Sequence, residues 1–341
     1  MRVRAIVGAA AILALCPTSP GHAQTLPGFY KGKTVDLYIG YSAGGGYDVY
    51  ARALARHMGR FIPGNPTIVP KNMPGGGHLV AANYMYKVAP KDGTAIATLL
   101  PAFVSYQILD GKQVEYDAAK FNWIGASDVD NHNLYVWHTT GVRSIEDAKK
   151  NEVLMGSTGA GSYTGLYPTL LNNLIGTKFK VVSGYKSTNE IHLAMERGEV
   201  QGRAGNLFSS LISQNKDWLD EKKINILMQV GSKRDPDFKD VPLMTELTSD
   251  PEKKRILTIY SGDVALGRSF ITTPGVPADR LAALRKAFDE TMTDPEFLAD
   301  AKNINMQVRP LGHEELAAAA TEILSTPPEL IEKAKKAKEG G

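Results

Sequence analysis

The chain has 341 residues, 43% of them hydrophobic and 22% charged, and its formal net charge is +3. This length predicts two domains rather than one, and the composition is ordinary for a globular protein. So small a charge gives no support to nucleic-acid binding or to a polybasic membrane surface. A single cysteine leaves no disulfide framework.

Residues 1–23 have the features of a secretory signal peptide. Arg2 and Arg4 form a basic start, residues 5–15 form an apolar core, and small residues precede a cleavage site after Ala23. We therefore expect export and removal of this segment, which lowers the formal charge from +3 to +1.

A lipid anchor on Cys16 is the alternative to cleavage after Ala23. Residues 13–16 loosely resemble a lipoprotein box, although Leu15 fits such a box poorly. Cleavage after Ala23 would instead leave a mature chain without cysteine. No later segment approaches the ~18 consecutive apolar residues of a membrane span, so we expect a water-soluble mature protein.

Residues 41–48, Tyr-Ser-Ala-Gly-Gly-Gly-Tyr-Asp, join a predicted strand to a predicted helix. Apolar residues alternate along 35–39 and recur at helical spacing over 51–61, and Asp48 stands where a helix N-cap is expected. A glycine turn at a helix N-terminus presents several N–H groups in one direction, which favours an anion. The alternative is a plain strand-to-helix turn.

The next elements repeat this pattern. A strand at 67–69 leads to a second glycine turn at 72–77, a helix at 79–87 and a strand at 95–99. Strands that alternate with helices predict a mostly parallel sheet covered on both faces, with its turns gathered at the carboxyl edge. The two glycine turns should therefore be neighbours.

The middle of the chain predicts a second region of the same kind, with the richest glycine turn at 156–162. Residues 203–206 follow a short expected strand, and a strand at 224–230 leaves the region. The other expected strands lie around 124 and at 134–137, 153–155, 179–182 and 200–202, and the expected helices at 144–150, 163–174 and 187–198.

Beyond residue 230 the elements still alternate. We expect strands at 268–272 and 307–309, helices at 277–291 and 313–324, and a solvated tail or frayed helix at 333–339. Because no long linker separates two α/β lobes, the chain should cross between them more than once, with a C-terminal segment that returns to the first lobe.

These motifs together resemble the extracytoplasmic solute receptors of the tripartite tricarboxylate transporters, the Bug family. The resemblance rests on residues 41–48, 71–77, 89–94, 156–162 and 240–242, in this order and behind an export signal. It implies an α/β, two-lobed periplasmic-binding-protein-like fold in which each lobe is a mostly parallel sheet flanked by helices.

The resemblance also implies a function. Lobe 1 would comprise 24–104 plus 231–341 and lobe 2 would comprise 105–230, and the lobes would close on a di- or tricarboxylate or an aromatic carboxylate. The protein would be a monomeric periplasmic receptor that delivers its ligand to membrane permease subunits. It would use no cofactor or metal and perform no catalysis.

By the same match, the two glycine loops would hold a carboxylate, largely through backbone amides. The ligand residues of the loops would be Ser42, Gly45, Gly46, Tyr47, Ser157, Thr158, Gly159 and Ser162. Tyr47 and Tyr163 suggest stacking on a flat ligand, with ordinary packing as the alternative. Asp48 would repel an anion, so we assign it to capping and loop order.

Residues 203–206 depart from the family pattern. The guanidinium of Arg203, with Asn206 beside it, could grip a second carboxylate bidentately. The alternative is a surface or interlobe salt bridge. Arg52, Arg56 and Arg60 recur every four residues, which indicates a solvated helix face or a contact with a membrane partner.

Rival functions fit less well. Residues 156–162 resemble a P-loop, but Ser162 and Tyr163 occupy the positions of its lysine and hydroxyl residue. Residues 128–133 begin like a calcium loop but lack its glycine. An orphan receptor that signals to a sensor protein, or a phosphate- or nucleotide-binding enzyme, remain as alternatives.

Overall fold

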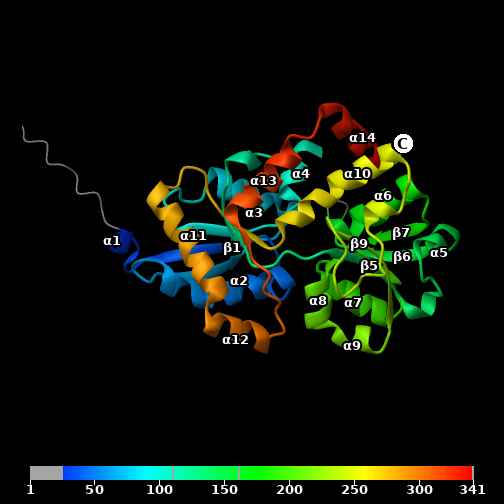
Figure 1. Ribbon diagram of the computed structural model, residues 1–341, viewed down its shortest axis with the longest axis horizontal. Helices are drawn as coiled ribbons and strands as arrows, with labels where there is room; N and C mark the ends of the chain where they lie inside the picture. The colour runs from blue at the N-terminus through cyan, green and yellow to red at the C-terminus, as the bar shows by residue number, and fades with distance from the viewer. Residues whose placement is uncertain (1–25, 110, 160–161, 340–341) are drawn as a thin grey trace, which may run out of the picture.

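The computed structural model describes residues 26–109, 111–159 and 162–339. These residues form two lobes, each a β-sheet flanked by helices (Figure 1). The two-lobed fold expected from the sequence is therefore confirmed. No helix in these ranges is long and apolar enough to cross a bilayer.

Lobe 1 is built on a six-stranded sheet in which β1 pairs in parallel with β2 and β3, while β10 and β11 run antiparallel to their neighbours. The strands, in spatial order, are β11 (Leu311–Gly312), β4 (Asn122–Ala126), β10 (Ser269–Thr272), β3 (Ala95–Thr98), β1 (Thr34–Ile39) and β2 (Thr67–Asn72).

Lobe 2 is built on a five-stranded sheet. Here β6 is parallel to β7 and β8, while β5 is antiparallel to β8 and β9. The spatial order is β7 (Phe179–Ser183), β6 (Val153–Ser157), β8 (Gly202–Leu207), β5 (His132–Trp137) and β9 (Ile224–Val230). Both sheets are thus mixed, and the expected parallel pairing is found around β1 and β6, the strands that lead into the two glycine loops.

Helices cover both sheets (Figure 1). Those packed around lobe 1 are α1 (Leu26–Tyr30), α2 (Gly46–His57), α3 (Leu79–Lys87), α4 (Phe103–Leu109), α11 (Ala278–Thr293), α12 (Pro295–Asn303) and α13 (His313–Leu324). Those of lobe 2 are α5 (Ile145–Lys150), α6 (Tyr163–Ile175), α7 (Thr188–Glu196), α8 (Phe208–Gln214) and α9 (Lys216–Asp220).

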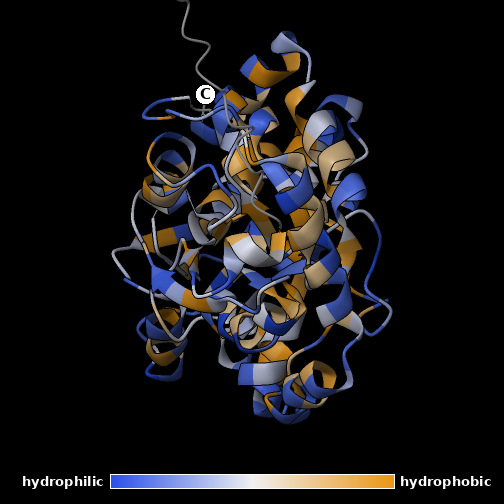
Figure 2. Cartoon of the chain, turned by 90° about the vertical axis from the view of Figure 1, so that its left-hand side faces the viewer, coloured by the Kyte–Doolittle hydropathy of each residue, from blue (hydrophilic) through white to orange (hydrophobic). Residues whose placement is uncertain are grey.

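The expected apolar patterns form the core. Val35, Leu37 and Ile39 of β1 are fully buried, together with Ala51 and Leu54 of α2. Figure 2 shows helices striped with hydrophobic and hydrophilic residues, as expected for elements that cover a sheet on one face. This packing fixes the orientation of α2 and hence of the loop that precedes it.

The expected lobe limits need two corrections. First, β4 pairs with β10 in the sheet of lobe 1, so the chain enters the second sheet only between Ala126 and His132. The sheet that β4 joins is decided by the strand with which it pairs, and that strand, β10, lies far from β4 in the sequence.

Second, the C-terminal segment packs on lobe 2 rather than only on lobe 1. The expected tail is a helix, α14 (Pro328–Glu339), which lies beside α6 and α10 (Pro251–Gly262) (Figure 1). Its Ala334 and Ala337 are buried, and their carbonyl oxygens accept hydrogen bonds from Tyr260 and Asn173.

Two strand predictions are displaced. Residues 203–206 lie inside β8, not in a turn after it, and a bulge at Gly205, with φ of +67°, keeps this strand paired with β5. The last strand is β11, at Leu311–Gly312, rather than 307–309.

Candidate ligand-binding site

A cavity of about 530 Å³ lies between the two lobes and is lined by both glycine loops. Of the residues predicted from the sequence, the structure brings five together in its wall: Ser42, Gly45, Thr158, Gly159 and Ser162. The two loops therefore face one another across a single site, as expected from their places after β1 and β6.

The first loop is ordered by a side chain outside the cavity. Asp48 lies in the first turn of α2 rather than at its N-cap, which is Gly45. The buried Asp48 carboxylate accepts hydrogen bonds from the Gly44 amide at 2.9 Å and from Arg52 Nε at 2.9 Å. Burial alone would raise the pKa of Asp48, but these donors outweigh it and leave that pKa below its usual range. The Gly45 N-cap has no side-chain cap, which leaves N–H groups of α2 available to a ligand.

The second loop is held by its own hydroxyl groups. The buried Ser157 Oγ accepts from the Gly159 amide at 3.0 Å, and Ser162 Oγ donates to the Gly159 carbonyl at 2.8 Å. The Thr158 amide donates to Thr164 Oγ1 at 3.0 Å. Gly159 has φ of +138°, a conformation that favours glycine. Ser157 thus supports the loop from behind, while its neighbours form the wall; residues 160–161 lie outside the described part of the chain.

Tyrosine rings form much of the remaining wall. Tyr41 and Tyr163 line the cavity, and each is backed by a second tyrosine. Tyr41 stacks on Tyr47 with ring centroids 4.4 Å apart, and Tyr163 stacks on Tyr167 at 5.0 Å. Tyr47 therefore packs behind Tyr41 and does not reach the cavity.

The other end of the cavity is formed by Gly75, Gly76 and His78 before α3 and by residues 185–189, which lead into and begin α7. The glycine turn at 72–77 was expected beside the turn at 41–48, and both line this cavity, whereas the contribution of residues 185–189 was not predicted from the sequence. Burial lowers the pKa of His78 to about 3, so this ring is neutral at pH 7. Lys186 is the one charged residue in the cavity wall among the described residues. The described residues of the wall therefore present a cation, amides and hydroxyls but no carboxylate.

Comparisons with known proteins agree with this architecture. No protein-family model matches the chain. Among curated proteins, the "UPF0065 protein in gbd 5'region" of Cupriavidus necator is 24% identical over 336 residues, which cover 96% of this chain and 95% of that protein. Among solved structures, the periplasmic binding protein BugD is 21% identical, with a TM-score of 0.68 over 90% of this chain and 98% of BugD. Rpa4515 of R. palustris, solved with adipate, is 20% identical, with a TM-score of 0.67 over 90% of this chain and 98% of Rpa4515.

The chain has the BugD fold. The resemblance predicted from the sequence is confirmed at this level, because a periplasmic binding protein of that type matches almost end to end. MatC of Rhodopseudomonas palustris, solved with malate, is a further match, 18% identical with a TM-score of 0.66 over 88% of this chain and 99% of MatC.

Arg203 and Asn206 do not line the cavity of this BugD-type fold in the structure. Both are buried side chains of β8, on the same side of lobe 2 as Tyr135 and His192. Arg203 Nη1 lies 2.5 Å from His192 Nε2, and Asn206 Nδ2 donates to Tyr135 Oη at 3.3 Å. Arg203 makes no ion pair with a described carboxylate, so the alternative of a structural salt bridge finds no partner here.

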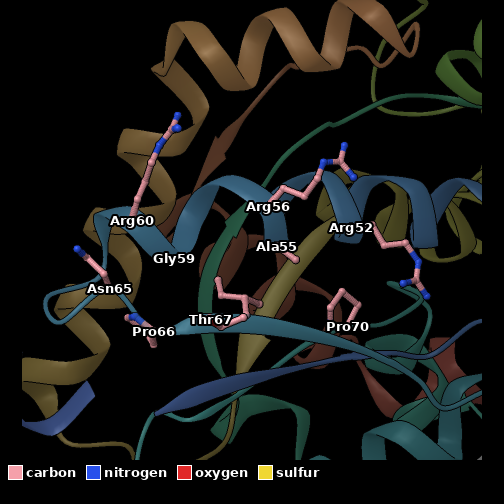
Figure 3. Close-up of a pocket in the computed structure, with 10 residues that line it drawn as sticks. Arg52, Ala55, Arg56, Gly59, Arg60, Asn65, Pro66, Thr67 and Pro70 are labelled. Atoms are coloured by element: carbon pink, nitrogen blue, oxygen red, sulfur yellow. The ribbon is translucent and has the colours of Figure 1, made fainter. Parts of the chain in front are cut away.

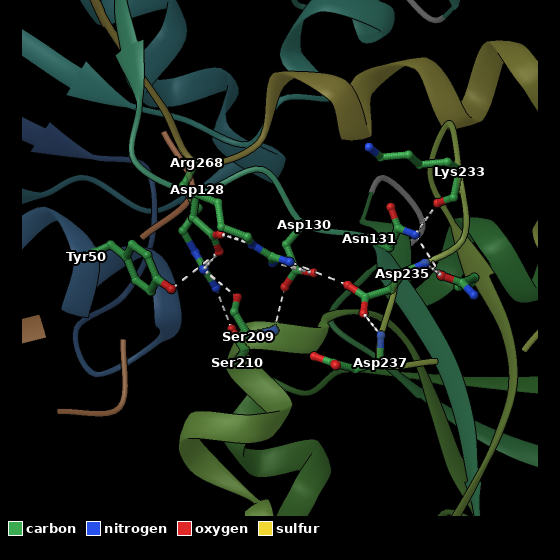
Figure 4. A network of polar contacts seen from close by, with 12 residues as sticks. Tyr50, Asp128, Asp130, Asn131, Ser209, Ser210, Lys233, Asp235, Asp237 and Arg268 are labelled. Carbon is green, nitrogen blue, oxygen red and sulfur yellow. Dashed lines mark hydrogen bonds and ion pairs between the residues drawn. The ribbon is translucent and has the colours of Figure 1, made fainter. Parts of the chain in front are cut away.

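Gly46 packs against a buried ionic cluster that joins the lobes (Figure 4). Arg268 Nη1 is 2.8 Å from Asp128 Oδ2 and donates to Ser209 Oγ at 2.8 Å. A Cβ added at Gly46 would lie 2.8 Å from Ser210 Oγ and 3.0 Å from Arg268 Nη2. Gly46 is therefore required for close approach of the first loop to this cluster, not for the cavity wall.

A second hollow, of about 590 Å³, lies between α2 and β2 on lobe 1 and is lined by Arg52, Arg56 and Arg60 (Figure 3). Each of these arginines is paired with an acid: Arg52 with Asp48, Arg56 with Asp300, and Arg60 with Asp294 and Glu296. His57, Asp294 and Glu296 are close enough to share a metal ion, but Arg60 already contacts both carboxylates. The charges of these three arginines are thus balanced by acids of the same chain.

Proposed function

We propose that the protein is a Bug-family periplasmic solute receptor that binds a small organic carboxylate between its lobes. It carries this ligand to the membrane permease of a tripartite tricarboxylate-type transporter and performs no covalent chemistry. Residues 1–23, the proposed export signal, lie outside the described part of the chain.

The observation that carries this proposal is the convergence of two glycine loops on one cavity without an acidic wall. Each loop precedes a helix, and the partial positive charge of a helix N-terminus attracts an anion by about 0.3–1 kcal/mol when exposed. Closure of the lobes removes water and strengthens this attraction, because the effective dielectric constant falls. A metal or cofactor is not needed for such binding.

The proposed contacts divide into two groups. Ser42 and Gly45 from lobe 1 and Thr158, Gly159 and Ser162 from lobe 2, which line the cavity, would touch the ligand. Gly46, Tyr47 and Ser157 support these loops from behind. Specificity would then come from the uncapped amides at the start of α2 and from hydroxyl groups of both loops, because the Thr158 and Gly159 amides are bonded within their own loop. Such donors suit a carboxylate because it accepts hydrogen bonds only.

The cavity volume supports a small ligand. About 530 Å³ lies toward the lower part of the ~300–1,000 Å³ found for small-molecule sites. Two structures with this fold were solved with adipate and with malate, and carboxylates of that size suit such a cavity.

A thermal-shift screen of the mature chain against mono-, di- and tricarboxylates tests the proposal. We expect at least one carboxylate to raise the unfolding temperature in a concentration-dependent way, because a ligand that binds only the folded state stabilises it. Intrinsic tryptophan fluorescence should change with the same ligand. Absence of stabilisation by any carboxylate, together with turnover of a phosphate ester or nucleotide, would instead support the enzyme alternative.

A further inference from the structure

Arg203 is a buried cation without a counter-charge. Only 4% of this residue is exposed, and no described carboxylate lies within ion-pair distance of it. Its Nη1 donates to neutral His192, Tyr135 is a further neutral hydrogen-bond partner, and its Nε has no hydrogen-bond partner among the described residues. An unpaired buried guanidinium is costly, because its charge has left water without an opposite charge to replace it. An anion from a bound ligand would neutralise this guanidinium.

The groups around Arg203 are neutral. Burial, followed by the charge of Arg203, lowers the pKa of His192 to about 2, so this imidazole carries no charge at pH 7. Tyr135 Oη lies 2.9 Å from His192 Nε2 and accepts from Asn206 Nδ2. No residue of this cluster balances the guanidinium.

A second buried side chain nearby also lacks partners. Asn133 is fully buried and stands opposite Asn206 in the pairing of β5 with β8. Neither its side-chain nitrogen nor its side-chain oxygen has a hydrogen-bond partner in the described structure. Two donors, Arg203 Nε and Asn133 Nδ2, are therefore left without acceptors on one side of β5 and β8. Buried donors are normally satisfied, which points to missing acceptor oxygens.

The cluster lies against the interlobe cavity. Gly205, two residues after Arg203 in β8, is part of the cavity wall, as are Thr188 and Asn189, one turn before His192 on α7. Tyr41 of lobe 1, also in the wall, is near enough to interact electrostatically with Arg203. The guanidinium therefore lies behind the lobe 2 wall of the cavity, among residues whose neighbours form that wall.

We propose that Arg203, with Asn133 and Asn206, forms a second anion subsite, so that the cleft selects molecules with two carboxylates. One carboxylate occupies the glycine loops and the other neutralises Arg203. This inference rests on the proposed receptor function and names its ligand class. The role of Arg203 is to determine specificity, because a monocarboxylate has no group to pair with it.

Calorimetric titration of the mature wild-type chain and of Arg203→Met, Arg203→Lys and Arg285→Met tests this subsite. The probes are malate, succinate and adipate, with butyrate and hexanoate as monocarboxylates. Arg285→Met is the matched control, since Arg285 donates to the Trp123 carbonyl in lobe 1, away from the cavity wall.

For a dicarboxylate that binds the wild type, we expect Arg203→Met to weaken binding about a hundredfold, because removal of one partner leaves a buried carboxylate unpaired. Monocarboxylate binding should change by less than about threefold, and Arg203→Lys should recover part of the loss. Equal losses for both classes, or no loss, would overturn the proposal.

A measurement without ligand separates this inference from the receptor function. If Arg203 awaits a ligand anion, Arg203→Met should leave the unfolding temperature of the free protein unchanged or raise it, because the variant removes an unpaired buried charge. A fall of several degrees relative to Arg285→Met would show a structural cation and overturn the inference. If no probe binds the wild type, the receptor proposal fails, and this result still decides the role of Arg203.

Discussion

Asp48 shows how a residue outside the cavity shapes the site. Its carboxylate ties the Gly44 amide, Arg52 and Asn72 together just behind the first loop. The loop amides are thereby oriented before a ligand arrives, which lowers the entropic cost of binding.

We predict that Asp48→Ala lowers the free energy of unfolding by about 1–3 kcal/mol, because the Gly44 amide, Arg52 and the Asn72 side chain lose a buried acceptor. Denaturant unfolding measures this change. Glu115→Ala, which removes an exposed pair with Lys87, is the control and should cost less than about 1 kcal/mol. Equal effects of the two substitutions would show that Asp48 does not order the loop.

Asp263 is a buried carboxyl group with one close donor, Ser105, at 2.5 Å. Burial raises the pKa of Asp263 to about 7, although Ser105 opposes this shift. The folded protein therefore holds this proton more tightly than the unfolded chain does. The contribution of this proton to the free energy of unfolding is complete below about pH 4 and is lost as the pH rises to about 7.

The variant Asp263→Asn removes this titration. We expect the stability difference, variant minus wild type, to rise by about 1 kcal/mol per pH unit from pH 4 to pH 7 and then level off. Buried histidines such as His132, whose pKa is lowered to about 3 by burial, destabilise both proteins in acid and cancel in the difference. A difference that is flat or falls with pH would contradict this role of Asp263.

At the scale of elements, local signals predicted most of the structure. Ser144 and Ser187 cap α5 and α7 by accepting from backbone amides three residues later, as their sequences indicate. Asp250 caps α10, and Pro251 stands at its first position, an equally clear helix start.

What the sequence did not predict depends on distant partners. The membership of β4 in lobe 1 requires β10, and residues 203–206 form a strand because they pair with β5. Five predicted site residues reach the cavity, whereas Gly46, Tyr47 and Ser157 support it from behind. Side-chain direction within a loop is set by tertiary packing, which no local pattern encodes.

Helix α14 gives a test at this scale. We expect a chain that ends at Thr326 to unfold several degrees lower than the full mature chain, because the apolar faces of α6 and α10 that α14 covers become exposed. A chain that ends at Glu339 is the control and should match the full chain. Thermal unfolding of both truncations measures the effect, and equal midpoints would show that α14 contributes no packing energy.

At the scale of the molecule, a buried ionic cluster joins the lobes beside the first glycine loop (Figure 4). Arg268, the residue before β10 in lobe 1, donates to Ser209 and Ser210 at the start of α8 in lobe 2. Arg309 binds Asp128 at 3.0 Å and Asp130 at 2.8 Å in the segment that crosses between the sheets. These contacts hold the lobes together on the side of the cavity where Gly46 lies.

We predict that the double variant Ser209→Ala/Ser210→Ala increases the radius of gyration of the ligand-free protein in small-angle X-ray scattering. Arg268 keeps Asp128 but loses its acceptors on lobe 2, so the contact between the lobes is weakened by about 1–3 kcal/mol. Ser213→Ala, whose hydroxyl donates only within α8, is the matched control. An unchanged radius in the double variant would show that these serines do not restrain the lobes.

The central claim is that one carboxylate ligand contacts both glycine loops at once. Calorimetric titration of Gly45→Ala, Thr158→Ala and the double variant with a carboxylate identified in the screen tests it most directly. A Cβ at Gly45 meets nothing within 4 Å, and φ of −82° suits alanine, so this variant should fold normally. We expect a single site in the wild type, a loss of about tenfold in each single variant, and a non-additive loss in the double variant. Unchanged affinity in either single variant would contradict a ligand held between the two lobes.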